Sequence, residues 1–90
     1  MENTDIKILN KMEYFQTTCS QFDLKNIKQL ILEKNFDQPI EKLDLKNVTK
    51  LTTGWFFNQP IENLDLKNVK EFILGNNFNQ PIEKLDLKNI

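Results

Sequence analysis

The sequence contains no histidine and no arginine, and its only cysteine is Cys19. Histidine is the commonest general base and metal ligand, so its absence argues against most acid–base catalysis and most metal centres. All 12 basic residues are lysines, so no guanidinium group is present for bidentate recognition of phosphate or carboxylate. A lone cysteine excludes an intrachain disulfide and a thiolate metal cluster, and it fits a reducing compartment.

The chain also lacks an excess of charge and a long apolar run. Its formal net charge is −1, whereas nucleic-acid binding usually requires a basic face. No apolar stretch approaches the ~20 residues of a membrane span. The start, MENTDIKILNKMEYF, has neither the basic beginning nor the apolar core of a secretory signal. We therefore expect a single domain, residues 1–90, that is intracellular and cytoplasmic and contacts neither nucleic acid nor membrane.

What the sequence does contain is a repeat. FNQPIE occupies residues 57–62 and returns unchanged at 78–83, and FDQPIE stands at 36–41. Counting back another 21 residues from 36 reaches Phe15, where the motif is degraded to FQTTCS. A fixed period of 20 to 50 residues indicates a solenoid, in which each repeat stacks on its neighbours. The predicted coils are 15–35, 36–56 and 57–77, with partial coils at 1–14 and 78–90.

The same residue types recur at this spacing in register, and we call each such set a column. Four columns are adjacent in the sequence: Asp23, Asp44, Asp65, Asp86; Leu24, Leu45, Leu66, Leu87; Lys25, Lys46, Lys67, Lys88; and Asn26, Asn47, Asn68, Asn89. An apolar column is predicted at Leu9, Leu30, Leu51 and Phe72. Because one unit cannot bury its apolar face alone, neighbouring units must supply a continuous core.

Short strands are the only regular elements that fit between the breakers of each unit. LDL at 43–45 alternates with period 2, and LIL at 30–32 and FIL at 72–74 form a second β-like segment. Gly54 and Gly75 follow that second segment, where a turn is expected. The three prolines, which lack an N–H donor, belong at corners: Pro39, Pro60 and Pro81. The predicted fold class is a β-rich, leucine-rich-repeat-like solenoid with short parallel strands.

The polar columns have a structural and a functional interpretation. Stacked asparagines can bond along their column from side-chain amide to side-chain amide, although the column could instead hold a ligand. Asp44 and Lys46 share a face, so the acidic and basic columns run side by side and screen each other. This predicts a solvated charged face, with a partner-binding face as the alternative. Calcium binding is not expected, because lysine stands beside each aspartate and no glycine precedes it.

The run from Val69 to Ile90, VKEFILGNNFNQPIEKLDLKNI, resembles the FNIP repeat. The matching positions are Phe72, Leu74, Gly75, Phe78, Asn79, Gln80, Pro81 and Ile82. The resemblance implies a leucine-rich-repeat relative of the kind found in amoebae and giant viruses, sometimes behind an F-box. No room for an F-box precedes these repeats, so an adaptor role is not expected. LDLKNVTKLTTGWFFNQPIENLDLKNV also resembles bacterial surface repeats, which we rank second.

Two residues depart from their columns. Trp55, the only tryptophan, stands where the neighbouring units have Lys34 and Asn76. A local change in packing explains it more simply than an exposed anchor, yet tryptophan is the best single candidate for an interface hot spot. Cys19 replaces the isoleucine of the other motifs, so we expect a buried structural thiol.

These observations predict a non-catalytic protein–protein interaction module with no cofactor and no metal. The partner is an unidentified protein, and the candidate contact residues are Asp44, Lys46, Trp55, Asp65 and Lys67. An enzyme or metal protein is the rival from another class. A second rival is a structural or truncated repeat fragment without a partner of its own. An uncapped stack also exposes a strand edge, which predicts self-association.

Overall fold

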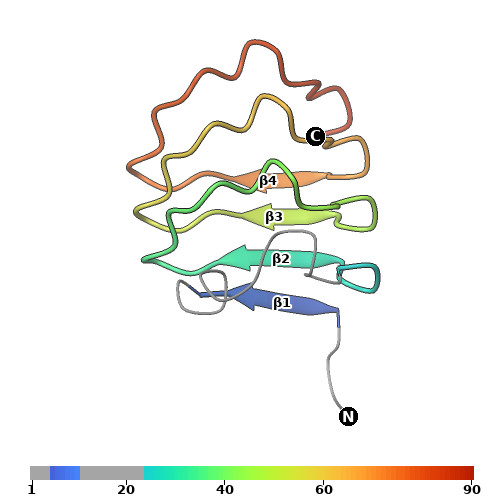
Figure 1. The fold of residues 1–90 in the computed structure, drawn as a ribbon. Helices are drawn as coiled ribbons and strands as arrows, with labels where there is room; N and C mark the ends of the chain where they lie inside the picture. Colours follow the sequence, from blue (N-terminus) through green and yellow to red (C-terminus); the bar gives the residue numbers. More distant parts are fainter. Residues whose placement is uncertain (1–4, 11–23) are drawn as a thin grey trace.

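The computed structural model describes residues 5–10 and 24–90, and these contain one parallel sheet and no helix. The sheet has four strands, which follow one another in chain order (Figure 1). The strands are β1 (Ile6–Leu9), β2 (Gln29–Leu32), β3 (Lys50–Thr52) and β4 (Glu71–Ile73). The predicted β segments around LIL and FIL are therefore confirmed.

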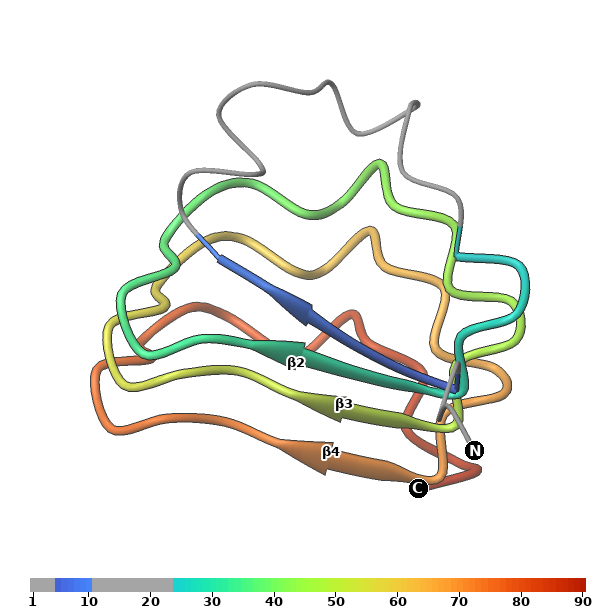
Figure 2. The ribbon, with the colours of Figure 1, turned by 90° about the horizontal axis from the view of Figure 1, so that it is seen from below.

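Parallel neighbours require the chain to cross back after each strand, and here every described crossover is an irregular return segment. Figure 2 shows the sheet along one side and the return segments along the opposite side. Residues 28–48, 49–69 and 70–90 are called the second, third and fourth units, and each begins just before its strand. The described residues before 28 belong to the first unit.

The LDL segment is not a strand, contrary to the sequence prediction. Leu43 and Leu45 are buried and Asp44 is exposed, so the predicted alternation is present. The backbone around it, however, forms local turn bonds: the Leu43 amide donates to the Ile40 carbonyl and the Val48 amide to the Leu45 carbonyl, at 3.0 and 2.9 Å. Alternation reports which side chains face the core, and it does not by itself supply a hydrogen-bonded ladder.

The 21-residue register holds between the last three strands but not at the first. Leu30 pairs with Leu51, and Leu51 with Phe72, as predicted. Leu9, however, pairs with Leu32 and not with Leu30, so its predicted column is wrong. The offset there is 23 residues, and a shift by two keeps the same side chains facing inward. Phe15 and Cys19 lie outside the described residues.

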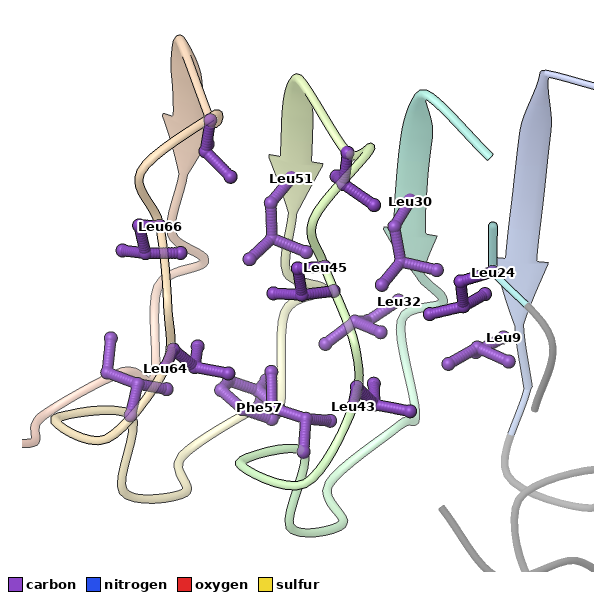
Figure 3. Close-up of a cluster of buried hydrophobic side chains, with 14 of the residues drawn as sticks. Leu9, Leu24, Leu30, Leu32, Leu43, Leu45, Leu51, Phe57, Leu64 and Leu66 are labelled. Atoms are coloured by element: carbon purple, nitrogen blue, oxygen red, sulfur yellow. The ribbon is translucent and has the colours of Figure 1, made fainter. Parts of the chain in front are cut away.

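The core runs through the stack as columns of identical or similar apolar side chains (Figure 3). Phe36 and Phe57 stack with ring centroids 6.4 Å apart, and Phe57 and Phe78 with centroids 6.2 Å apart. Phe36 and Phe57 are fully buried. Each unit therefore fills the gap that its neighbours leave, as expected for a repeat protein.

Neither glycine has a positive φ, so the backbone conformation does not call for glycine at these positions. Glycine is required because the backbones of neighbouring units approach closely there. A Cβ atom on Gly54 would lie 2.3 Å from the Glu33 carbonyl oxygen, and one on Gly75 would lie 2.1 Å from the Gly54 oxygen. Each glycine also opens a turn: the Phe57 amide donates to the Gly54 carbonyl at 3.4 Å and the Phe78 amide to the Gly75 carbonyl at 3.3 Å. The predicted turns are confirmed.

We expect Gly54→Ala to lower the free energy of unfolding by about 1–3 kcal/mol, because the added methyl group must push two units apart. Urea denaturation followed by circular dichroism measures this loss. Lys34→Ala, at an exposed turn position of the preceding unit, is the matched control and should change stability little. A Gly54→Ala variant as stable as this control would contradict the close-approach argument.

We expect Phe57→Leu to cost about 1–2 kcal/mol of unfolding free energy, since leucine leaves part of the ring volume empty between two stacked neighbours. Phe78→Leu makes the same change at a half-buried position and should cost less. The two variants are compared by urea denaturation. Equal losses of unfolding free energy in the two variants would show that stacking on both sides of Phe57 adds nothing to stability.

Candidate functional site

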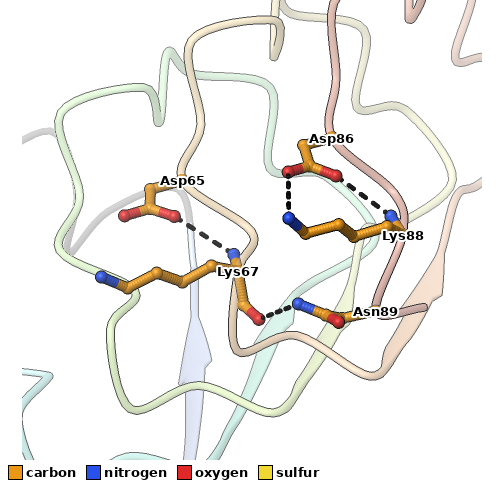
Figure 4. A network of polar contacts seen from close by, with 5 residues as sticks. All are labelled: Asp65, Lys67, Asp86, Lys88 and Asn89. Carbon is orange, nitrogen blue, oxygen red and sulfur yellow. Dashed lines mark hydrogen bonds and ion pairs between the residues drawn. The ribbon is translucent and has the colours of Figure 1, made fainter.

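The Asp–Leu–Lys–Asn segments at 44–47 and 65–68 form turns that precede β3 and β4, and the segment at 86–89 forms a similar turn (Figure 4). The Asp65 carboxylate accepts a hydrogen bond from the backbone amide of Lys67 at 3.1 Å, and Asp86 does the same for Lys88 at 3.2 Å. Asp44 repeats the contact with Lys46. Such an aspartate holds its own turn in place. The aspartate column is thus engaged in local structure at each of these three turns.

The asparagine column joins neighbouring units. The side-chain amides of Asn47, Asn68 and Asn89 donate to the backbone carbonyls of Lys25, Lys46 and Lys67 in the preceding units. The distance from the Asn89 side-chain nitrogen, Nδ2, to the backbone oxygen of Lys67 is 2.8 Å. The predicted structural role is confirmed, but the predicted amide-to-amide bond is not formed. The acceptor is the backbone because the turn presents its carbonyl to the next unit.

The FNQPIE motif also bonds to its preceding copy. The backbone N–H of Asn58 donates to the Asp37 carboxylate at 2.9 Å, and the Gln59 side-chain amide donates to the backbone carbonyl of Asp37 at 3.1 Å. The next unit repeats this pattern with Asn79 and Gln80 on Asn58. The polar residues of the motif therefore hold the stack together. Their bonds between units account for these side chains without an external ligand.

The structure divides the predicted contact residues between two edges of the sheet. In a parallel sheet, all turns that precede strands lie at one edge and all turns that follow strands lie at the other. Asp44, Lys46, Asp65 and Lys67 belong to turns of the first kind, and Trp55 belongs to a turn of the second kind. Trp55 is 49% exposed and its neighbour Phe56 is 44% exposed, so Trp55 is not part of the core. The four charged residues and Trp55 thus do not form one site.

Sequence reasoning missed the outer face of the sheet. The strand register aligns Ile8, Ile31, Thr52 and Ile73 in one row across all four strands. Ile8 is 54% exposed and Ile73 is 47% exposed, whereas the two middle residues are half-buried. We call these four residues the outer row. The signal was available, because each of the first three lies beside an inward-facing leucine of its strand and must point the other way.

A second row lies beside the outer row and is mainly polar. It consists of Ile6, Gln29, Lys50 and Glu71. The Lys50 ammonium group lies 3.7 Å from the Glu71 carboxylate, and both side chains are partly exposed. An exposed ion pair of this kind contributes little to stability. The outer face therefore combines an apolar stripe with a polar margin.

Residues 3–90 match the family described as "Mycoplasma protein of unknown function, DUF285". The chain belongs to this family. The predicted FNIP membership is therefore wrong, and so is the predicted link to amoebae and giant viruses. The Phe-Asn-Gln-Pro-Ile motif led to the wrong family assignment. Its asparagine forms contacts between stacked units, and such contacts do not identify one family. The second-ranked resemblance, to bacterial surface repeats, agrees in part with membership of this family. No curated protein and no solved structure gives a significant match.

Two further features of this DUF285 chain concern its ability to hold a metal ion or a small ligand. Residues 5–10 and 24–90 bring together no group of three or more cysteine, aspartate or glutamate side chains that could hold a metal ion. A hollow of about 270 Å³ is lined by Asp5, Lys25, Asn26, Lys28 and Asn47. All five residues are exposed, so the hollow has no buried polar group to bind a ligand. No helix in the described ranges could cross a membrane.

We expect Asn68→Asp to lower the free energy of unfolding by about 1–3 kcal/mol, because a carboxylate oxygen would face the Lys46 carbonyl with no hydrogen between them. Asn76→Asp adds the same charge at an exposed turn position and is the matched control. Thermal and urea denaturation measure both. If Asn76→Asp costs as much, the loss reflects added charge and the inter-unit bond is not its cause.

Proposed function

We propose that this DUF285 chain is a protein-interaction module whose binding surface is the outer face of the sheet. The carrying observation is the outer row, in which three isoleucines and a threonine cross four strands without an intervening charged residue. Sheets made only of parallel strands usually have both faces covered. Here the return segments cover the inner face, and Ile8 and Ile73 leave the outer face accessible in the described residues.

The composition of the outer face suits a protein partner. Interfaces combine an apolar centre with a polar rim, and the outer row has the mainly polar row of Gln29, Lys50 and Glu71 along one side. Exposed apolar surface rimmed by polar residues is typical of protein–protein interaction sites. The occupant that fits best presents an apolar strip about as long as the sheet is wide.

Support for a non-catalytic role comes from what the carboxylates do. Asp44, Asp65 and Asp86 bind the amides of their own turns. Glu41 and Glu62 accept hydrogen bonds from the backbone amides of Asn63 and Lys84, at 2.8 and 3.3 Å. Acid–base catalysis needs a carboxylate positioned towards a substrate, whereas each of these five carboxylates holds a backbone amide in place.

The proposal also specifies the fold more closely than a four-stranded parallel sheet. We propose that the units form a right-handed, leucine-rich-repeat-like β-solenoid, since crossovers between parallel strands are almost always right-handed. The constant 21-residue offset between β2, β3 and β4 supports this description. A cytoplasmic location, which the single cysteine fits, completes the proposal.

We expect Ile8→Lys/Ile73→Lys to abolish capture of a partner, because two ammonium groups would stand in the outer row. Immobilised chains are incubated with a lysate of cells that carry the gene, and retained proteins are cross-linked and identified. Two further variants serve as controls at the sheet edges: Lys46→Glu/Lys67→Glu and Trp55→Ala. Circular dichroism verifies that every variant is folded.

Retention of the same protein by the wild type and both edge controls, but not by the outer-row variant, is the expected result. Loss in an edge control together with retention by the outer-row variant would move the site to that edge. If no form retains a protein, the interaction proposal fails.

A further inference from the structure

The turns that follow the strands carry an aromatic pair in the third unit alone among the second, third and fourth units. We call residues 34–35, 55–56 and 76–77 the corners of these units; they stand 21 residues apart. The outer two corners have polar side chains, whereas the middle one has Trp55 and Phe56. Trp55 is 49% exposed and Phe56 is 44% exposed, although a unit lies on each side of them. Their exposure therefore belongs to the middle of the stack.

The fold does not require aromatic side chains at this corner. The Phe56 amide donates to the Lys34 carbonyl at 3.1 Å, and the Asn77 amide donates to the Trp55 carbonyl at 3.2 Å. The same backbone bond thus joins the second corner to the third and the third to the fourth. Because only backbone atoms take part, the lysine and asparagine of the other corners would serve the stack equally well. Two exposed rings in an otherwise polar position therefore need another explanation.

The amide side chains beside the aromatic pair are not used by the protein. Elsewhere in the repeat, asparagine side chains bond to a neighbouring unit, as those of Asn58 and Asn68 do. In the corners, three exposed asparagine side chains make no hydrogen bond to any other residue: Asn35, Asn76 and Asn77. Each carboxamide offers two donors and an acceptor. Unused polar groups thus flank the rings from the unit before and from the unit after.

We propose that the middle corner binds a saccharide, with one pyranose ring packed on the exposed surface of Trp55 and Phe56. A pyranose has an apolar face of C–H groups and a rim of hydroxyls, so it can cover an aromatic ring and still form hydrogen bonds. Hydroxyls both donate and accept, and so do the three flanking carboxamides. The ammonium group of Lys34 adds donors. Aromatic surface with a few placed polar groups is the usual composition of a ligand site.

The spacing and charge of the corners favour a saccharide over other ligands. Units joined by backbone hydrogen bonds lie about 4.8 Å apart, so one sugar ring on the middle corner can reach carboxamides on both sides. A protein partner would need about 800 Å² of surface, whereas the apolar part of this site is two side chains. Aromatic rings also bind cations, but the three corners contain no carboxylate and Lys34 would repel a cationic ligand.

Tryptophan fluorescence tests this proposal directly, because Trp55 is the only tryptophan and reports on this corner alone. The 90-residue chain is titrated with maltohexaose, cellohexaose, chitohexaose and mannohexaose. Tetramethylammonium chloride, adenosine and a polyproline peptide probe the rival ligand classes. We expect a saturable change with at least one oligosaccharide and none with the three rival probes. No saturable change with any of the four saccharides would overturn the proposal, and so would saturation by a rival probe.

Variants within the corners identify the residues that bind. Phe56→Asn introduces the residue that both neighbouring corners have, so it should fold and keep its reporter, and it should weaken saccharide binding about tenfold. Asn76→Ala should weaken binding about fivefold, as expected for one lost hydrogen bond. Asn63→Ala, at an exposed position of a return segment, is the matched control and should bind like the wild type. Unchanged binding in Phe56→Asn, or a loss in Asn63→Ala, would refute the assignment to this corner.

The outer-row variant Ile8→Lys/Ile73→Lys separates this site from the proposed protein interface. It should bind saccharide like the wild type, since the aromatic corner lies in a turn at the edge of the sheet. Loss of saccharide binding in this folded variant would place the ligand on the outer face and overturn the proposal. Partner capture by the outer row is measured separately, so either proposal can fail alone.

Discussion

Hydrogen bonds from side chains of one unit to the unit before it are the interactions on which the rest of the structure depends. The strands are only three or four residues long, so the sheet ladder alone orders a small part of each unit. Asn68, Gln59 and Gln80 bind the polar backbone of the return segments, where regular secondary structure is absent. No buried side-chain nitrogen or oxygen in the described ranges lacks a partner. A polar repeat can therefore enclose a continuous apolar core.

Much of this architecture could be predicted from the spacing of residue types. The recurring leucine, phenylalanine and valine positions placed the core, because stacked units must align side chains of similar size. The glycines were predicted as turn residues, but their closeness to the neighbouring backbone needs three dimensions to be seen. LDL was misread as a strand because burial alternates there without a partner strand. Leu9 was misplaced because a shift by two residues preserves the inward face and leaves no trace in the hydrophobic pattern.

The candidate surface was harder to predict for a different reason. Asp44, Lys46, Asp65 and Lys67 are charged and periodic, which favoured them as contact residues. Their periodicity instead serves the structure: the aspartates hold their own turns, and the lysine carbonyls accept hydrogen bonds from the next unit. The outer row consists of Ile8, Ile31, Thr52 and Ile73, residues whose shape favours strands whatever they contact. β-branched residues on an outer face therefore do not stand out in the sequence. Only the register, which sets them side by side, makes them a surface.

The inter-unit side-chain bonds described above share a direction. Asn47, Asn58, Asn68, Gln59 and Gln80 each donate to an acceptor about one repeat earlier in the chain. A unit can therefore complete these bonds only when the preceding unit is already in place. Chains emerge from the ribosome with the N-terminal end first, so acceptors become available before their donors. The stack is thus suited to grow by addition of one unit at a time during synthesis, with each finished unit acting as the template for the next.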